Sequence, residues 1–271
     1  MIVLYILLGV FIVMGCIALA RKESSAINDD NPYHHPERKS ALPKDMREYI
    51  KDVKKPERRR GIYEKVFKRA VDVIMSFCGL VILSPIYAIL CLAVIIDDPG
   101  PVFFKQKRVG KNRTFFYLHK FRSMKMSTPH DMPTHMLENP DQYITRVGKF
   151  LRKSSLDEIP QIWDIFRGKM SIIGPRPALW NQADLVLERE KYGANDVTPG
   201  LTGWAQINGR DELEIPVKAK LDGDYCKRIS FLFDCRCFIG TIFSVARGDG
   251  VVEGGTGEIK KQQEEKEEIK Q

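Results

Sequence analysis

Residues 70–96 read AVDVIMSFCGLVILSPIYAILCLAVII, and this apolar stretch decides how the chain is organised. As one helix it would measure about 40 Å, enough to cross a hydrocarbon core of about 30 Å. Ser84 and Pro85 stand in its middle, and an internal proline breaks a helix because it lacks an N–H donor and clashes with the preceding turn. The two arms, about 21 Å and about 16 Å long, are each too short to span. The sequence therefore predicts a membrane helix broken at Ser84-Pro85.

Both flanks of this segment are basic. The flanking cations are Lys54, Lys55, Arg58, Arg59, Arg60, Lys65, Lys68 and Arg69 before it and Lys105, Lys107 and Arg108 after it. Because positive flanks stay on the cytoplasmic side of a membrane, this pattern favours a re-entrant helix over residues 66–97 that enters and leaves the same face. An ordinary span with a kink is the alternative interpretation.

A second apolar run precedes it at the N-terminus. Residues 2–20 carry no charge and are followed at once by Arg21 and Lys22, which predicts a transmembrane helix over residues 1–21 with its C-terminal side in the cytoplasm. A cleaved signal peptide is disfavoured by the missing basic n-region. Residues 22–61 have the composition of a basic polar linker, and residues 258–271 that of a charged tail.

The overall composition points to an anionic partner. Lys and Arg outnumber Asp and Glu by 43 to 35, which suits phosphate groups or a lipid headgroup surface. No zinc-finger spacing and no RNP-type aromatic motif is visible, so we expect no nucleic-acid partner. The six cysteines fit no disulfide framework or zinc site and are expected to be reduced thiols.

The remainder of the chain mixes short strands and helices. Residues 101–124 predict a β-hairpin, in which two runs of aromatic and β-branched residues flank a turn at Gly110-Lys111-Asn112. Helical periodicity covers residues 144–168, 179–192 and 215–247, with a Gly-rich segment at residues 198–210. The predicted fold is therefore a helix-rich α+β domain over residues 62–257, associated with a membrane.

Two adjacent acids lie in the motif SLDEIPQ, residues 155–161. Ser155 and Glu158 match the spacing of a helix capping box, so a purely structural role is one interpretation. In the other, Asp157 is a nucleophile, kept ionised by a helix N-terminus, and Glu158 holds Mg²⁺ together with phosphate oxygens.

Cationic residues surround this acidic pair in the sequence. Arg176 lies between two prolines, and a stiffly held guanidinium suits the bidentate binding of a diphosphate. Arg152 belongs to the basic run that precedes Asp157. A surface arginine in a rigid turn, and a solvated basic face, are the structural alternatives.

Five motifs, in this order along the chain, resemble the bacterial sugar transferases, the monotopic polyprenyl-phosphate phosphoglycosyl transferases. They are KRAVDVIMSFCGLVILSP, DPGPVFFKQKRVG, HKFRSM, ITRVGKFLRKSSLDEIPQIWDIFRGKMSIIGPRPAL and TPGLTGWAQINGR. The likeness runs from about Phe67 to Gly257, so the first 60 residues inherit no role from it and are interpreted as an extra anchor.

The resemblance implies a role for each matching position. It places the catalytic dyad on Asp157 and Glu158, the helix break on Ser84 and Pro85, and phosphate-contacting groups on Arg152, Arg176, Lys120 and Arg122. It also implies transfer of a sugar-1-phosphate from a UDP-sugar to a polyprenyl phosphate, with release of UMP, a covalent phospho-sugar-aspartate and a requirement for Mg²⁺. The enzyme would face the cytoplasm at the inner membrane and supply the later glycosyl transferases of a surface polysaccharide pathway.

Two other functions compete with this one. An ordinary glycosyl transferase would pass on only the sugar and release UDP. A non-enzymatic membrane adaptor would bind lipid or a protein through its basic face and would not need the carboxylate of Asp157. The identity of the released nucleotide separates the three.

Overall fold

The computed structural model describes residues 53, 56–58, 60–128, 142–209 and 213–247. The predicted N-terminal transmembrane helix, most of the linker and the charged tail lie outside these residues. Within the described residues the first helical elements are η1 (Tyr63–Phe67, a π-helix), α3 (Lys68–Ile82) and α4 (Ser84–Asp97). The elements that follow are β1 (Phe103–Val109), η2 (Lys111–Arg113), β2 (Phe115–Phe121), α5 (Arg146–Lys153), η5 (Leu156–Glu158), α6 (Gln161–Phe166) and β3 (Ser171–Ile173). The last are α7 (Ala183–Glu190), η6 (Ala194–Asp196), β4 (Gly200–Thr202), α8 (Trp204–Ile207), α9 (Ile215–Arg228) and α10 (Phe231–Arg247).

The apolar segment forms a bent pair of helices, as the proline predicted. The helical arms Tyr63–Ile82 and Ser84–Asp97 meet at an angle of 62°. Pro85 lies in the first turn of α4, where its missing N–H costs nothing, and the Ser84 hydroxyl donates to the carbonyl of Val81 at 2.8 Å. Within the described residues no single helix has the length and hydropathy to cross a membrane, whereas the bent pair has both when its arms are combined.

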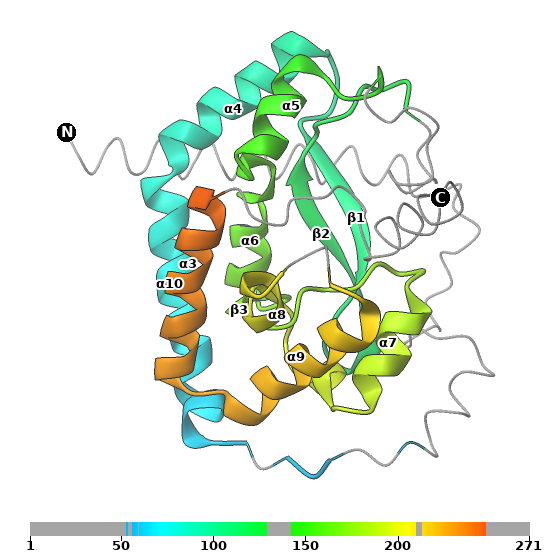
Figure 1. Cartoon of the computed structure of the whole chain (residues 1–271). Coiled ribbons are helices and arrows are strands. Elements are labelled where there is room, and N and C mark those ends of the chain that lie inside the picture. The colour runs from blue at the N-terminus through cyan, green and yellow to red at the C-terminus, as the bar shows by residue number, and fades with distance from the viewer. Residues whose placement is uncertain (1–52, 54–55, 59, 129–141, 210–212, 248–271) are drawn as a thin grey trace, which may run out of the picture.

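The α3 helix has an inverted amphipathic pattern. Lys68, Asp72 and Ser76, spaced four residues apart, are buried against the rest of the protein, while Ile74 and Phe77 are 61% and 53% exposed. Polar groups inside and apolar groups outside are unfavourable in water and favourable in lipid. The α10 helix, drawn across α3 in the view of Figure 1, meets the start of α3 through the ion pair of Asp234 with Lys68, and it too leaves large apolar side chains exposed.

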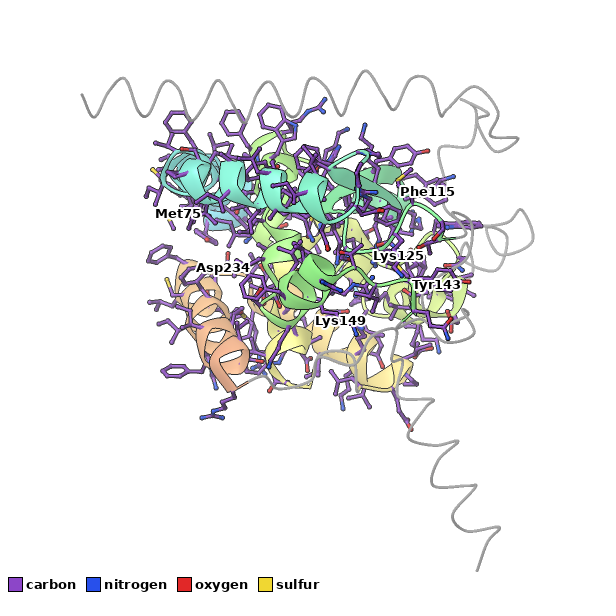
Figure 2. The ribbon with its side chains drawn as sticks, turned by 90° about the horizontal axis from the view of Figure 1, so that it is seen from above. Met75, Phe115, Lys125, Tyr143, Lys149 and Asp234 are labelled. Atoms are coloured by element: carbon purple, nitrogen blue, oxygen red, sulfur yellow. The ribbon has the colours of Figure 1, made fainter. Side chains whose placement is uncertain are left out.

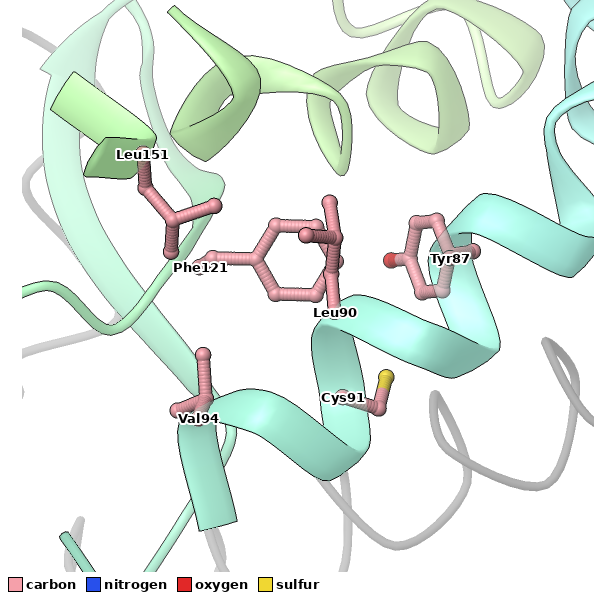
Figure 3. Packing of buried hydrophobic residues seen from close by; sticks show 6 residues of the cluster. All are labelled: Tyr87, Leu90, Cys91, Val94, Phe121 and Leu151. Carbon is pink, nitrogen blue, oxygen red and sulfur yellow. The ribbon is translucent and has the colours of Figure 1, made fainter. Parts of the chain in front are cut away.

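The hairpin forms where the sequence predicted it. β1 and β2 pair antiparallel in a register that sets Phe103 opposite Phe121 and Val109 opposite Phe115. The α4 helix packs on one end of the hairpin through a cluster of Tyr87, Leu90, Cys91, Val94, Phe121 and Leu151 (Figure 3). This contact joins the bent helix pair to the strand that carries Lys120.

The long helix expected over residues 144–168 is divided into three pieces. The α5 helix ends at Lys153, η5 is a single 3-10 turn, and α6 begins at Gln161. The break falls at Ser155, whose φ of 55° lies in the left-handed region. The predicted capping box is wrong, because the Ser155 side chain accepts no backbone hydrogen bond in this conformation. The helix predicted over residues 179–192 is shorter than expected and corresponds to α7, and the 215–247 prediction is confirmed as α9 and α10.

Candidate active site

The acidic pair occupies the short 3-10 turn η5 between α5 and α6. Asp157 is 7% exposed and Glu158 9%, so both carboxyl groups are largely removed from water. The left-handed residue Ser155 interrupts the helix just before them, and the turn that carries the pair packs against β2 of the hairpin. A buried carboxylate needs a charged or hydrogen-bonded partner.

Two cations from distant parts of the chain supply those partners. Lys120, on β2, places Nζ 2.9 Å from Glu158 Oε1 and 3.4 Å from Asp157 Oδ2. Arg176, in the GPRP turn after β3, donates from Nη2 to Glu158 Oε1 at 2.5 Å and from Nη1 to Oε2 at 3.3 Å. The structure therefore brings four of the predicted site residues into one charge-balanced cluster.

Asp157 and Glu158 are both buried, but their pKa values move in opposite directions. Burial raises the pKa of Asp157, and the negative charge of Glu158 adds to this effect, while Lys120 partly opposes it. Burial acts in the same direction on Glu158, but Arg176 and Lys120 together outweigh it and hold the pKa of Glu158 well below its usual range. A helix N-terminus was expected to favour ionised Asp157. Instead, Asp157 stands in a three-residue turn, and burial raises its pKa.

Close backbone packing positions Arg176. β3 and β4 pair in parallel, with Ser171 opposite Gly200. The N–H of Gly200 donates to the carbonyl of Pro175 at 2.9 Å, and a Cβ on Gly200 would lie only 2.1 Å from the nitrogen of Gly174. Because Gly200 has no side chain, the backbone of β4 can pack directly against the turn that carries Arg176.

The other two predicted phosphate ligands have different neighbours. Arg122 donates from Nη1 to Asp98 Oδ2 at 2.6 Å and from Nη2 to the Asp98 carbonyl, so it joins β2 to the end of α4. Arg152 donates from Nε to Ser123 Oγ at 2.8 Å. A phosphate-binding role for either arginine stays a prediction.

Sequence reasoning missed the residues that hold this site in place. Arg69, on α3, donates to the carbonyls of Ile165 and Phe166 at 2.6 and 2.7 Å, at the end of the helix that follows the acidic pair. Asp72 accepts the N–H of Ile172 at 3.0 Å, on the strand that leads to Arg176. The available signal was the presence of charged residues in or directly before an apolar segment, because such groups need partners inside the protein.

A second polar contact supports the helix after the acidic pair. The carboxylate of Asp164, on α6, accepts the backbone N–H of His119 at 2.9 Å and lies 2.8 Å from His119 Nδ1. His119 directly precedes Lys120 on β2. The contact therefore fixes α6 against the strand that supplies the cation.

The donor set at the acidic pair suits a metal ion that arrives with its substrate. Within the described part of the chain, no group of three or more His, Cys, Asp or Glu residues has the arrangement of a metal site. Two adjacent carboxylates are nevertheless the kind of ligand that Mg²⁺ takes when phosphate oxygens and waters supply the rest. Asp157 and Glu158 fit that pattern.

Comparison with known proteins assigns the family. The family model for bacterial sugar transferases matches residues 63–248, and the chain belongs to this family. It is 39% identical over 193 residues to a UDP-glucose:undecaprenyl-phosphate glucose-1-phosphate transferase of Xanthomonas campestris pv. campestris, covering 69% of this chain and 40% of that protein. An Escherichia coli K12 protein of the same name is 37% identical over 192 residues, with 66% and 40% covered. The exopolysaccharide production protein PSS of Rhizobium leguminosarum bv. phaseoli is 36% identical over 196 residues, with 68% and 98% covered. The chain thus spans about two fifths of the first two relatives and nearly all of the third.

Proposed function

We propose that this protein transfers a sugar-1-phosphate from a UDP-sugar to a polyprenyl phosphate and releases UMP. The observation that carries the proposal is the buried acidic pair held by Lys120 and Arg176, because such a cluster offers both a nucleophile and ligands for a diphosphate. The names of relatives support the acceptor, since they include transferases that act on undecaprenyl phosphate.

The chemistry divides into two displacements at one phosphorus atom. A carboxylate oxygen of Asp157 attacks the β-phosphorus, the bond to the bridging oxygen breaks, and UMP leaves with that electron pair. An oxygen of the polyprenyl phosphate then attacks the same phosphorus, and the Asp157 carboxylate is restored as the leaving group. Lys120 and Arg176 neutralise the oxygens on which negative charge accumulates.

The raised pKa of Asp157 suits a nucleophile. A carboxylate that burial makes less stable gains more when its oxygen bonds to phosphorus than a well-solvated one does. Glu158 stays ionised and keeps Arg176 and Lys120 aligned. Glu158 would also hold Mg²⁺, which supplies charge neutralisation of the diphosphate when it is bound.

The membrane placement of this reaction rests on the bent helix pair. We propose that α3 and α4 dip into the inner leaflet and return, because their exposed surface is apolar and both flanks are basic. The exposed apolar side chains of α10 would lie at the same membrane surface. Asp234, at the start of α10, pairs with Lys68 of α3, and Figure 2 shows Asp234 and Met75 on the same side of the molecule. The site would then face the cytoplasm and pass its product to later glycosyl transferases of exopolysaccharide synthesis.

One assay separates this function from its alternatives. Purified full-length protein is incubated with Mg²⁺, undecaprenyl phosphate and a panel of UDP-sugars, and the released nucleotide is identified. UMP is expected, UDP would indicate transfer of the sugar alone, and no turnover with any sugar would favour an adaptor.

A matched pair of variants tests the covalent step. Asp157→Asn should abolish UMP release and any radiolabelled phospho-sugar bound to the protein, because an amide cannot form the acyl phosphate. Asp184→Asn, an equal change at an exposed acid of α7, is the control and should behave as the wild type. Substantial turnover by Asp157→Asn would disprove the covalent route.

A further inference from the structure

Gln161 is a buried amide without partners. Its side chain is 1% exposed, and neither Nε2 nor Oε1 has a hydrogen-bond partner in the structure. Leaving such a group unpaired costs free energy that a leucine of similar size would not cost. Buried polar side chains in native proteins are rarely left this way, so the amide needs a reason to be there.

Its position points to the acidic pair. Helical hydrogen bonds continue from η5 into α6, with the N–H of Ile159 donating to Leu156 and that of Trp163 donating to Pro160. Residues three and four apart on such a segment share a face. Gln161 follows Glu158 by three residues and Asp157 by four, and so lies on their face.

This face is turned toward β2. Ile165, one helical turn beyond Gln161, packs against Phe116 and Leu118 of that strand. Lys120 follows Leu118 by two residues and so projects from the same side of the strand. Gln161 therefore lies between the apolar contact of Ile165 and the ion pairs of Lys120.

Substrate binding changes what the acidic pair needs. In the structure Lys120 and Arg176 both donate to Glu158, yet these are the two cations proposed to bind the diphosphate. When phosphate oxygens take part of their hydrogen-bonding capacity, the buried carboxylates lose donors. A buried carboxylate left short of donors is strongly unfavourable.

We propose that Gln161 is a positioning residue, whose Nε2 donates to the carboxylates of the acidic pair once the diphosphate engages Lys120 and Arg176. This proposal rests on the proposed function. The amide carries two N–H donors, so it can replace a hydrogen bond that a cation gives up. The loss of stability caused by the unpaired amide is then explained by its use as a hydrogen-bond donor in the transfer step.

Replacing Gln161 with leucine tests this directly. Gln161→Leu should raise the Tm by about 2–4 °C, because an unpaired buried amide is removed. The same change should lower kcat by about 10- to 100-fold, since a misplaced nucleophile loses alignment. The KM for the UDP-sugar should change by less than about threefold, because the diphosphate still binds the two cations. The acid limb of the kcat–pH profile should move to higher pH, because the ionised carboxylate has lost a donor.

Gln206→Leu provides the matched control. Gln206 is also a buried amide whose Nε2 and Oε1 have no partner, but it lies on α8, which packs against α9 and α10. It should gain stability without losing kcat. If Gln161→Leu fails to fold, Gln161→Met, which is unbranched like glutamine, is judged by the same criteria.

The outcomes separate this inference from the proposed function. Absence of UMP release by the wild type would overturn the proposed function, and the inference with it. Wild-type turnover with a Gln161→Leu kcat within twofold of it would overturn the inference alone. Equal losses of kcat in the Gln161 and Gln206 variants would also overturn it, since the effect would then belong to buried amides in general.

Discussion

Gly200→Ala should damage the site without changing any group that touches substrate. The new Cβ would lie 2.1 Å from the nitrogen of Gly174 and 2.6 Å from its Cα and carbonyl oxygen. Non-bonded contacts of this kind need about 3.5 Å, so the two backbones must separate by about 1.4 Å. The neighbouring atoms are backbone rather than the end of a flexible side chain, so they cannot simply rotate away.

A backbone shift of this size is large for Arg176, which hydrogen-bonds to Glu158. Arg176 follows Gly174 by two residues, and its Nη2 is 2.5 Å from Glu158 Oε1. A misplacement of about 1 Å in an active site can cost about 100-fold in rate, so kcat/KM should fall by about that factor, or about 2.7 kcal/mol. Overpacking should also cost about 1–3 kcal/mol of stability.

The assay is UMP release with undecaprenyl phosphate and the preferred UDP-sugar, at a temperature where the variant is folded. Gly61→Ala is the matched control, because a Cβ at Gly61 meets nothing within 4 Å. It should leave kcat/KM unchanged. If Gly200→Ala retains kcat/KM within twofold of the wild type, the contact between Gly174 and Gly200 does not position Arg176.

Three further predictions address acid–base behaviour, stability and topology. The acid limb of kcat/KM should lie above the ordinary aspartate pKa of about 3.9, because burial raises the pKa of Asp157 and only the ionised form attacks. Lys120→Met should move that limb to still higher pH, since Lys120 lowers this pKa, and a limb left in place would contradict the assignment. Asp234→Asn should destabilise the protein by about 3–5 kcal/mol, measured by thermal unfolding, because Lys68 donates to this buried carboxylate at 2.5 Å and would lose its counter-charge. A loss below about 1 kcal/mol would show that the pair contributes little. Pro85→Ala restores a backbone donor at the bend and should let the two arms straighten, so that engineered cysteines near the end of α4 become labelled from the opposite side. Unchanged one-sided labelling would count against the proline as the cause of the bend.

Elements that depend only on residues adjacent in the sequence could be predicted from the sequence. The bend follows from Ser84-Pro85 alone, because a proline inside a helix removes a donor and creates a clash whatever surrounds it. The hairpin likewise follows from two adjacent strand-forming runs and a short turn, which pair with little loop entropy. The two acids of SLDEIPQ stood out locally only as an adjacent pair with capping-box spacing, and the resemblance to the sugar transferases made them candidates for catalysis.

Partners that come from far along the chain were decided only by the tertiary structure. Ser155 and Glu158 have the spacing of a capping box, yet Glu158 binds Arg176 and Lys120. A buried carboxylate without a cationic partner costs more free energy than an uncapped short turn does. Arg122 and Lys120 are two residues apart, but only Lys120 reaches the acidic pair, whereas Arg122 binds Asp98. Local spacing sets which face a side chain takes, while packing between distant segments sets which charge it meets there.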